Sequence, residues 1–434
     1  MSTDVRFATV KSLIKILEHD KFFDEVFAEY SEKVENTAEL VNMLSGTVKS
    51  KLTLDFCIEK ASSKNVKRLS PVVRNILRAA IYELEYLNTP DYAVVNSFVG
   101  LCRKLDKGAE GFVNGVLRGF IRKRSGIAPD EKELGEEKFL SIKFSHPEWL
   151  IRKWLKHYGR EKTEKICAYN NAPPKTVLRF NALKTDKNSL IKLFSDNEIE
   201  FEESAYCKDC LILKSGGNVR DIPGYREGFW VVQGESSSLV AEILAPQAGE
   251  RILDMCAAPG GKTTHIAALM GDVGEVVAVD ISPERLKKVE ENCARLGVKS
   301  VKTVVGDGTT IQAGENFDRI LVDAPCSNTG VLIARPDARW KRTPEDLQNL
   351  TKLQMAILKN AVGQLKTGGT LVYSTCSIEP EENEILIRAF LEDNKAFSLE
   401  NFMFAGAEQP GMLQILPCDY GIDGFFIVKL RKKK

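Results

Sequence analysis

Apolar residues recur at helical intervals through the first part of the chain, from Val5 to about Arg124, with almost no strand-like alternation. The first such pattern consists of Leu13, Ile14, Ile16, Leu17, Phe22, Phe23, Val26 and Phe27. A second pattern follows Ser70, a predicted N-cap, and Pro71 at the first helical position. This part of the chain is therefore predicted to form a helix bundle.

The C-terminal half instead alternates short apolar runs with helical patterns. The runs are 251–253, 275–279, 301–305, 320–322 and 370–373, and the helical patterns are 263–270, 283–296 and 347–365. Short apolar runs between helices are typical of parallel strands buried on both faces. We therefore expect a doubly wound α/β sheet, with its ligand beyond the carboxyl ends of the strands.

Between these halves the composition changes twice. Residues 127–144 are acidic and contain Gly and Pro, which indicates a linker. A helix is then expected with Ser145 as its N-cap and Trp149 and Trp154 in its core. A strand from 176, a helix near 189–193 and a strand at 210–213 follow, as in a β-α-β insert. The predicted domains are 1–126 (all-α), 127–144 (linker), 145–235 (small α+β) and 236–434 (α/β).

Composition excludes several classes of protein. With 434 residues, 43% of them hydrophobic and 28% charged, the chain has the profile of a multidomain globular protein. It has neither a bilayer-spanning apolar run nor a signal peptide's apolar core, so we expect a cytoplasmic protein without a membrane partner. Ten dispersed cysteines favour reduced thiols. Cys207 and Cys210 form a single CxxC without a second pair, so we expect them to be structural and expect no metal.

A glycine-rich turn between a strand and a helix marks the expected ligand site. Pro259, Gly260 and Gly261 let a ligand approach the backbone, and the helix that follows offers free N–H groups. A triphosphate-binding loop would require glycine where Cys256 stands. The turn is thus of a nucleotide-binding type without a triphosphate cradle.

Four acidic residues follow the predicted strands: Asp254, Asp280, Asp307 and Asp323. Asp280 lies about twenty residues after the glycine turn, where a carboxylate accepts hydrogen bonds from ribose hydroxyls. Asp307, flanked by two glycines, can accept from an adenine amino group. Since no second phosphate loop is present, a mononucleoside-like cofactor fits best, and S-adenosylmethionine is the first candidate.

Two cysteines also follow predicted strands. Cys326 lies in ILVDAPCSNTG and Cys376 in LVYSTCSIEPEENE. A random cysteine is most often a small buried hydrophobe. These two stand beside tight-turn and polar residues after neighbouring strands, which favours a chemical role in one pocket.

At this point the sequence resembles a known family. The segments DMCAAPGGKTTHIA, VDISPERL, GDGT, VDAPCSNTGVL, RPDARW and STCSIEPEENE are similar to successive motifs of bacterial 5-methylcytosine RNA methyltransferases. Residues 74–121, especially 93–96 and 111–118, resemble the RNA-binding fold of the antitermination factor NusB. Together they resemble the RsmB (Sun/Fmu) family of 16S rRNA methyltransferases over nearly the whole chain. One departure is Gly234, where that family usually has Asp.

The resemblance implies a fold, a reaction and roles for residues. The fold would be a NusB-like bundle, a small α+β RNA-binding subdomain and a Rossmann-like class I methyltransferase domain. Cys376 would attack carbon 6 of cytosine, Cys326 would assist proton loss or product release, and Asp323 would contact the base near nitrogen 3. The implied cofactor contacts are Cys256, Ala257, Ala258, Pro259, Gly260, Gly261, Lys262, Asp280, Arg285, Asp307 and Asp323.

Three points stay open in the sequence. Lys262 can approach either the cofactor carboxylate or an RNA phosphate, and Arg285 also fits an ordinary helix start. The basic residues Lys67, Arg68, Arg74 and Arg78, like those of 118–124, suit either a solvated helix face or the RNA docking that the NusB resemblance implies. The expected partner is 16S rRNA with an unstacked cytosine, bound by a monomer. The alternatives are a non-catalytic RNA-binding or assembly factor, or the same chemistry on transfer RNA.

Overall fold

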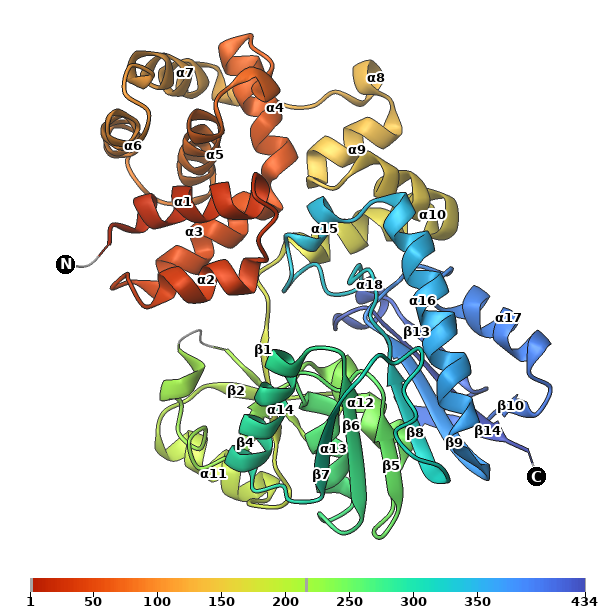
Figure 1. Ribbon diagram of the computed structural model, residues 1–434. Helices are drawn as coiled ribbons and strands as arrows, with labels where there is room; N and C mark the ends of the chain where they lie inside the picture. The colour runs from red at the N-terminus through yellow and green to blue at the C-terminus, as the bar shows by residue number, and fades with distance from the viewer. Residues whose placement is uncertain (1–2, 215–217, 434) are drawn as a thin grey trace. The chain divides into compact units, whose positions relative to one another are not determined.

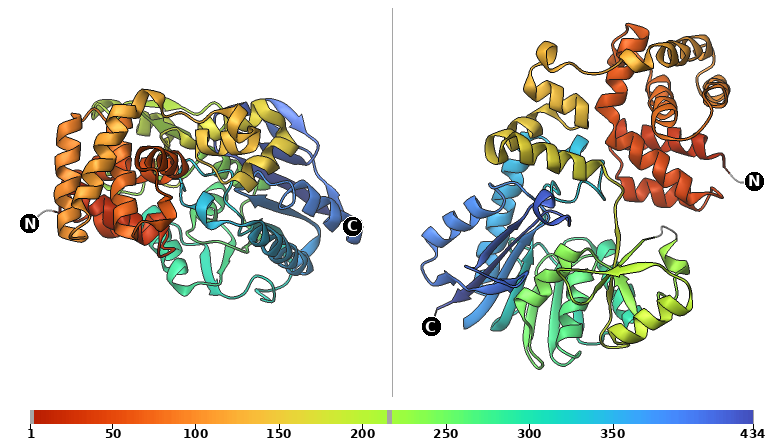
Figure 2. Two further views of the ribbon diagram at one scale, coloured as in Figure 1. Left: turned by 90° about the horizontal axis from the view of Figure 1, so that it is seen from above. Right: turned by 180° about the vertical axis from the view of Figure 1, so that it is seen from behind.

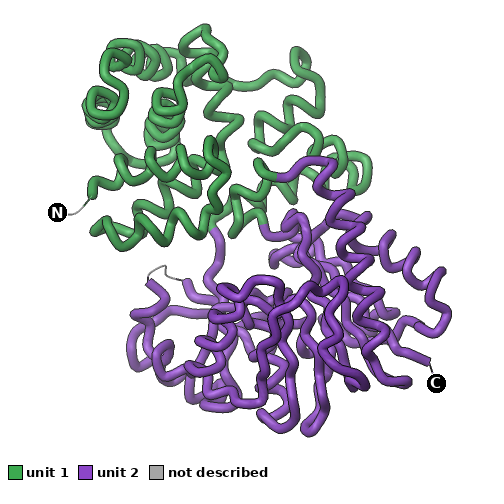
Figure 3. Tube along the Cα trace, in the orientation of Figure 1, with its two compact units in different colours: residues 1–173, 332–341 green, residues 174–331, 342–434 purple. Residues whose placement is uncertain are grey.

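The computed structural model describes residues 3–214 and 218–433. The chain divides into two compact units (Figure 3): residues 1–173 together with 332–341, and residues 174–331 together with 342–434. The first unit is helical, and the second contains the β-sheets. The unit boundary therefore falls at 173/174, and each unit is described by itself below.

The helical unit begins with a bundle around one apolar core (Figures 1 and 2). Ser70 caps α5 by accepting a hydrogen bond from the Val73 N–H, with Pro71 at the first helical position, as predicted. The long pattern from Leu13 to Phe27 is divided between two helices, α1 and α2. The bundle comprises α1 (Val5–Leu17), α2 (Phe23–Ser31), α3 (Thr37–Lys49), α4 (Lys51–Ser62), η1 (Val66–Arg68), α5 (Pro71–Tyr86), α6 (Asp91–Leu105), α7 (Glu110–Lys123) and η2 (Arg124–Gly126).

The expectation of a linker at 127–144 is wrong, because this stretch forms helices. They are α8 (Glu131–Leu134) and α9 (Glu136–Phe144), followed by α10 (Glu148–Asn171). The acidic residues lie on exposed helix faces, while Leu140 is fully buried against the neighbouring helices. The ion pairs of Arg160 with Glu131 and Glu136 also join α10 to this stretch.

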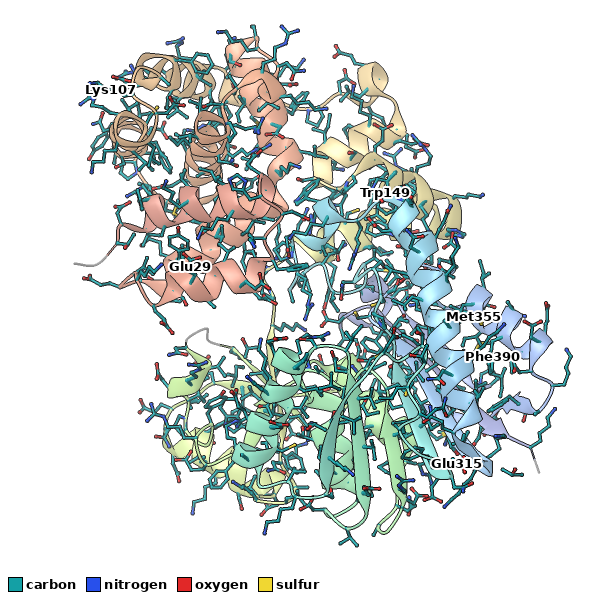
Figure 4. The ribbon with its side chains drawn as sticks, viewed as in Figure 1. Glu29, Lys107, Trp149, Glu315, Met355 and Phe390 are labelled. Atoms are coloured by element: carbon teal, nitrogen blue, oxygen red, sulfur yellow. The ribbon has the colours of Figure 1, made fainter. Side chains whose placement is uncertain are left out.

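The expectation for Ser145 is wrong as well. Ser145 does not cap α10: it ends α9 in a left-handed conformation with φ 54°, and its hydroxyl oxygen accepts from the Leu52 N–H. Pro147 occupies the N-cap position of α10 instead. Trp154 is completely buried, in line with its predicted core role, and Trp149, labelled in Figure 4, lies on the same helix.

The basic residues of the bundle fall into two groups. Arg78 is only 3% exposed and pairs with Asp55, while Arg74 pairs with Glu18. Lys67 and Arg68, by contrast, are exposed, as are Arg118, Arg122 and Lys123. The two arginines of α5 therefore form ion pairs within the bundle. Of the basic residues named here, the exposed ones are those that can contact a polyanion.

The segment 332–341, which contains the RPDARW motif, belongs to the helical unit. It includes α15 (Ala338–Lys341), and Arg339 is 1% exposed. The Arg339 guanidinium donates to the backbone oxygen of Ser145 at 3.1 Å and to the side-chain oxygen of Asn171 at 2.8 Å. This arginine of the motif thus fills a carbonyl-lined site within the helices.

The second unit begins with a small antiparallel sheet of order β2-β3-β1-β4. Its members are β1 (Thr176–Phe180), α11 (Lys187–Asp196), β2 (Phe201–Glu203), β3 (Cys210–Leu213), η3 (Val219–Asp221) and β4 (Trp230–Val232). Phe194 and Trp230 are fully buried in its core. The strand, helix and strand that the sequence predicts are all present.

The large sheet has the order β10-β14-β9-β8-β5-β6-β7, with β13 paired to β14. Its strands are β5 (Arg251–Asp254), β6 (Glu275–Asp280), β7 (Val301–Val305), β8 (Phe317–Asp323), β9 (Leu365–Thr375), β10 (Phe397–Leu399), β13 (Met412–Ile415) and β14 (Phe425–Lys432); β11 (Phe402–Phe404) and β12 (Ala407–Gln409) pair separately. The five predicted strands, β5 to β9, pair in parallel. The pattern did not predict β14, which pairs antiparallel with β9.

Helices cover both faces of the large sheet (Figure 1). One face packs against α12 (Glu235–Leu244), α13 (Gly261–Leu269) and α14 (Pro283–Leu296), and the other against α16 (Pro344–Gly363) and α17 (Glu384–Asp393); α18 (Pro417–Tyr420) follows β13. Figure 4 labels Met355 on α16 and Phe390 on α17, both in the second core. Within the described part of the chain, no helix has the length and apolar character required to cross a membrane.

Candidate active site

The glycine turn connects β5 to α13 at the carboxyl edge of the large sheet. Gly260 has φ +99°, and a Cβ atom there would lie 3.1 Å from Val289 Cα, so the position requires glycine. The Thr264 hydroxyl donates to the Gly260 carbonyl at 2.8 Å, which closes the first turn of the helix. The chain thus presents the start of α13 without a side chain in front of it.

Asp254, at the end of β5, is buried beneath this turn. Its Oδ2 accepts from the Thr263 hydroxyl at 2.7 Å, and its Oδ1 has no hydrogen-bond partner among the described residues. Burial raises the pKa of Asp254 to about 7. A buried carboxyl oxygen without a partner beside a glycine turn indicates that a polar ligand group belongs there.

Asp280, at the end of β6, joins two loops of the site. Its carboxylate accepts from the Ala258 N–H at 3.2 Å and from the Ser282 N–H at 3.1 Å. Arg285 donates to the Ala258 carbonyl at 2.8 Å and lies 3.5 Å from Asp280. Arg285 therefore supports the glycine turn from the start of α14, where Ser282 is the N-cap.

Asp307 follows β7 and is exposed. Its Oδ1 accepts from the Thr309 backbone N–H at 2.8 Å and from the Thr309 hydroxyl at 2.7 Å. These hydrogen bonds lower the pKa of Asp307. Its carboxylate is thereby fixed at the strand end with acceptor capacity to spare, since each oxygen has two lone pairs.

Lys262 and Asp323 form an ion pair in the site. The Lys262 Nζ lies 2.7 Å from Asp323 Oδ2, and the Ser374 hydroxyl donates to Asp323 Oδ1 at 2.8 Å. The sequence allowed two alternative partners for Lys262, a cofactor carboxylate and an RNA phosphate. Its partner within the chain is instead the acid at the end of β8.

The two predicted thiols lie side by side after the adjacent strands β8 and β9. Cys326 Sγ is 2.8 Å from Cys376 Sγ, and Asn328 Oδ1 accepts from the Cys376 thiol at 3.0 Å. Cys326 is 5% exposed, whereas Cys376 is partly accessible. The hydrogen bond to Cys376, together with burial, raises the pKa of Cys326 above its usual range. Burial, together with the nearby carboxylates of Asp254, Asp323 and Asp280, raises the pKa of Cys256, the third thiol of the site.

A buried acid that sequence reasoning missed supports both thiol loops. The Glu382 carboxylate accepts from the Ser327 N–H at 2.9 Å and from Gln354 Nε2 at 2.9 Å. The hydroxyls of Ser327 and Ser377, the residues that follow the two thiols, donate to its other oxygen. Glu382 is fully buried. The only available signal was its place in the STCSIEPEENE motif, because the charged run itself indicates a solvated surface.

The site therefore brings together most of the predicted residues. Ala257, Ala258 and Gly260 are buried at the turn, Pro259 is exposed beside them, and Cys256 and Gly261 are partly exposed. A turn that admits close approach and a carboxyl oxygen without a partner fit a nucleoside-containing ligand. The two thiols follow β8 and β9, of which β8 lies next to β5 in the same sheet, so they are at the same edge as the glycine turn.

Comparison with known proteins gives a consistent result over the whole chain. Residues 241–431 match the family described as "16S rRNA methyltransferase RsmB/F", residues 3–122 match the NusB family, and residues 146–220 match the ferredoxin-like domain of the RsmF/B-like methyltransferases. The "Probable ribosomal RNA small subunit methyltransferase B" of Bacillus subtilis is 36% identical over 99% of both chains. The "Ribosomal RNA small subunit methyltransferase B" of Escherichia coli K12 is 35% identical over the same share.

Solved structures support the same assignment. The crystal structure of PH0851 covers 100% of both chains with a TM-score of 0.83 and 26% identity. That of NSun6 from Pyrococcus horikoshii with SFG covers 66% of this chain and 98% of its own, with a TM-score of 0.61 and 27% identity. The predicted fold and the predicted cofactor, S-adenosylmethionine, are confirmed, and the chain belongs to the 16S rRNA methyltransferase RsmB/F family.

Proposed function

We propose that this rRNA methyltransferase modifies carbon 5 of a cytosine through a covalent adduct on Cys376. The observation that carries the proposal is the pair of thiols, 2.8 Å apart, at the ends of adjacent strands. The acid Asp323 ends the first of these strands, and its carboxylate is held by Lys262. Two thiols and one acid at a single sheet edge suit nucleophilic chemistry on a base.

Cytosine requires a nucleophile because carbon 5 is too electron-poor to attack a methylsulfonium directly. The Cys376 thiolate forms a bond to carbon 6, and the displaced electron pair makes carbon 5 nucleophilic. After methylation carbon 5 loses its proton, and the returning electron pair expels the Cys376 sulfur. The thiolate is regenerated and the aromatic ring restored, so the step balances without an oxidant or reductant.

The two thiols have different surroundings, which supports a division of roles. Cys376 is accessible to a base, whereas Cys326 is buried and, because its pKa is raised, keeps its proton. A protonated Cys326 donates a hydrogen bond to the Cys376 thiolate and so stabilises it. In its protonated form Cys326 is also placed to assist release of the methylated RNA, and it could take the carbon 5 proton only after giving its own proton to solvent.

Asp323 would orient the base. Its contacts with Lys262 and Ser374 fix the carboxyl group at the end of β8. In this position it can hold a proton at nitrogen 3, where negative charge develops when sulfur adds to carbon 6. Lys262, 2.7 Å from Asp323, lies close enough to offset that charge.

S-adenosylmethionine supplies an electrophilic methyl group when bound. We assign its contacts to the turn 256–262, to Asp280 and Asp307 at the next two strand ends, to Arg285, and to Asp323. Asp280 and Asp307 each retain free lone pairs for ribose and adenine groups. The substrate is assigned as an unstacked cytosine of 16S rRNA, because carbons 5 and 6 are out of reach in a packed helix.

Two variants test this function. Cys376→Ala should abolish methyl transfer to 16S rRNA, and Cys326→Ala should accumulate a protein–RNA adduct that survives a denaturing gel. Cys418→Ala, a cysteine on α18, is the matched control and should retain activity. Bisulfite sequencing of the product tests the position of the methyl group. Full activity of Cys376→Ala, or a product that bisulfite still converts, would overturn the proposal.

A further inference from the structure

A second group of ligand-type side chains lies in the sheet-containing unit, away from the two thiols of the active site. Asp209 lies in the turn before β3, Glu242 on α12 and His265 on α13. One ligand atom of each residue lies within 4.8 Å of those of the other two. Residues from three separate elements thus converge on one point.

His265 gives independent evidence that this point is a binding site. It is 1% exposed, and neither ring nitrogen has a hydrogen-bond partner among the described residues. Asp209 Oδ2 lies 3.7 Å from His265 Nε2, beyond hydrogen-bond length. Buried polar groups in native proteins are almost always satisfied, so a buried imidazole with two bare nitrogens indicates a missing ligand.

A thiol completes the group. Cys207 Sγ lies 3.4 Å from Glu242 Oε1, and the Cys207 side chain is 1% exposed. Cys210 Sγ in turn lies 2.9 Å from Cys207 Sγ and 3.4 Å from the Ser238 hydroxyl. The Cys207 sulfur therefore lies next to the Glu242 carboxylate, and the Cys210 sulfur contacts the Cys207 sulfur.

We propose that Asp209, Glu242, His265 and Cys207 bind a zinc ion. Imidazole, thiolate and carboxylate are the three ligand types of protein zinc sites, whereas magnesium and calcium favour oxygen ligands alone. Four ligands from the protein make a closed, structural site. The sequence suggested no metal because it offered only one CxxC, and two of the other ligands, Glu242 and His265, lie on helices 35 and 58 residues after Cys207.

The distances suit a tetrahedral ion. Bond lengths of about 2.0 Å to nitrogen or oxygen and about 2.3 Å to sulfur place tetrahedral ligand atoms roughly 3.3 to 3.8 Å apart. The separations of 3.7 Å between His265 Nε2 and Asp209 Oδ2 and of 3.4 Å between Cys207 Sγ and Glu242 Oε1 fall in this range. These two pairs already have the spacing of ligands on one tetrahedral ion, and the ligand atoms of Asp209, Glu242 and His265 all lie within 4.8 Å of one another.

The charges also balance. Two carboxylates and one thiolate carry three negative charges, which zinc and the buried guanidinium of Arg179 together offset. Arg179 is 1% exposed and donates to Gln233 Oε1 at 2.7 Å, without an ion pair to either carboxylate among the described contacts. The metal would join the turn at 207–210 to α13, the helix that begins at the glycine turn, and so hold the small sheet to the cofactor side of the unit.

The test measures metal and not methyl transfer, so its outcome is independent of the proposed reaction. The full-length protein, purified, stripped with a chelator and returned to zinc, should hold one zinc per chain by mass spectrometry of metals. With cobalt in place of zinc it should show the intense visible bands of a tetrahedral site and a near-ultraviolet sulfur-to-cobalt charge-transfer band.

Variants separate this site from chance binding. Cys207→Ser should remove the charge-transfer band, and His265→Gln or Asp209→Asn should weaken zinc binding at least about 100-fold. His157→Gln, which changes an exposed histidine, is the matched control and should bind like the parent. Circular dichroism checks that each variant is folded. The cobalt spectrum is measured on the parent protein, so the test does not depend on the folding of a variant. No bound zinc and no tetrahedral cobalt spectrum in the parent would overturn the proposal, as would a Cys207–Cys210 disulfide in the protein purified without oxidant.

Discussion

Replacing Glu382 by Gln removes a charge from beneath the two thiol loops while keeping the shape of the side chain. The Glu382 carboxylate takes four donors: the Ser327 N–H, the amide of Gln354, and the hydroxyls of Ser327 and Ser377. A glutamine can accept with only one of its two terminal atoms. Its oxygen will face the N–H and amide donors, which have no alternative, and its NH2 group will face the two hydroxyls.

The magnitude follows from that arrangement. Two hydroxyls that donate to a charged acceptor, at about 1.5 to 3 kcal/mol each, become neutral contacts worth about 1 kcal/mol each. The loss is roughly 1 to 4 kcal/mol in total. Because each serine follows a thiol residue in sequence, the loss loosens the relation between the two sulfurs. If it is expressed in the transition state, the rate constant falls about 5- to 850-fold.

The assay is single-turnover methyl transfer from labelled S-adenosylmethionine to 16S rRNA. Glu382→Gln should lower the rate constant while cofactor affinity by calorimetry stays unchanged, since Glu382 does not contact the glycine turn. The pH profile of Cys376 alkylation should shift as well, which a general loss of stability would not cause. Glu384→Gln, an exposed neighbour, is the control. A parent-like rate and alkylation profile for Glu382→Gln would refute the reasoning.

Two further predictions concern the glycine turn, to which we assign the cofactor. Burial raises the pKa of Asp254 from its ordinary 3.8 to about 7 in the folded chain, so its stabilising contribution is complete below about pH 3.8 and is lost as the pH rises through about 7. Asp254→Asn should therefore gain stability relative to the parent by roughly 2 to 3 kcal/mol between about pH 5 and pH 7 in urea unfolding, and a constant difference would contradict this. Gly260→Ala should weaken S-adenosylmethionine binding at least about tenfold in calorimetry, because alanine is strained at this φ and its Cβ meets Val289. Gly363→Ala, in open space on α16, is its control, and equal binding by both would contradict the argument.

The parallel part of the large sheet was predictable because local sequence determines it. Strands buried on both faces require continuous apolar runs, and the five predicted runs became β5 to β9. Once those strands are parallel, the residues that follow them share one edge, which brings Cys326 to Cys376. The antiparallel neighbour β14 is equally apolar, but its direction depends on pairing with β9 and not on its own pattern.

The expectations that were wrong share a different cause. In each, a charged residue was expected to be exposed to solvent. The stretch 127–144 is acidic, yet one helix face buries Leu140. Arg78 seemed part of a basic surface and is buried against Asp55. Glu382 stands in a run of acids, yet is completely buried because its donors come from Ser327 and Gln354, far away in sequence. The identity of one charged residue does not reveal a partner that is distant in the sequence. The burial of such a residue can therefore be known only from the three-dimensional structure.

Lys262 shows how far local pattern can lead at the site itself. Its place just after the glycine turn predicts a cation near the ligand, and the structure places Lys262 in the first turn of α13. The sequence offered only external partners, a cofactor carboxylate or an RNA phosphate. The fold supplies an internal one, because α13 starts at the same edge at which β8 ends in Asp323. In the mechanism that we propose, Asp323 contacts the base, and the Lys262 charge is already paired with Asp323 at 2.7 Å. We therefore propose that Lys262 acts on the base through Asp323 and not as an RNA phosphate contact.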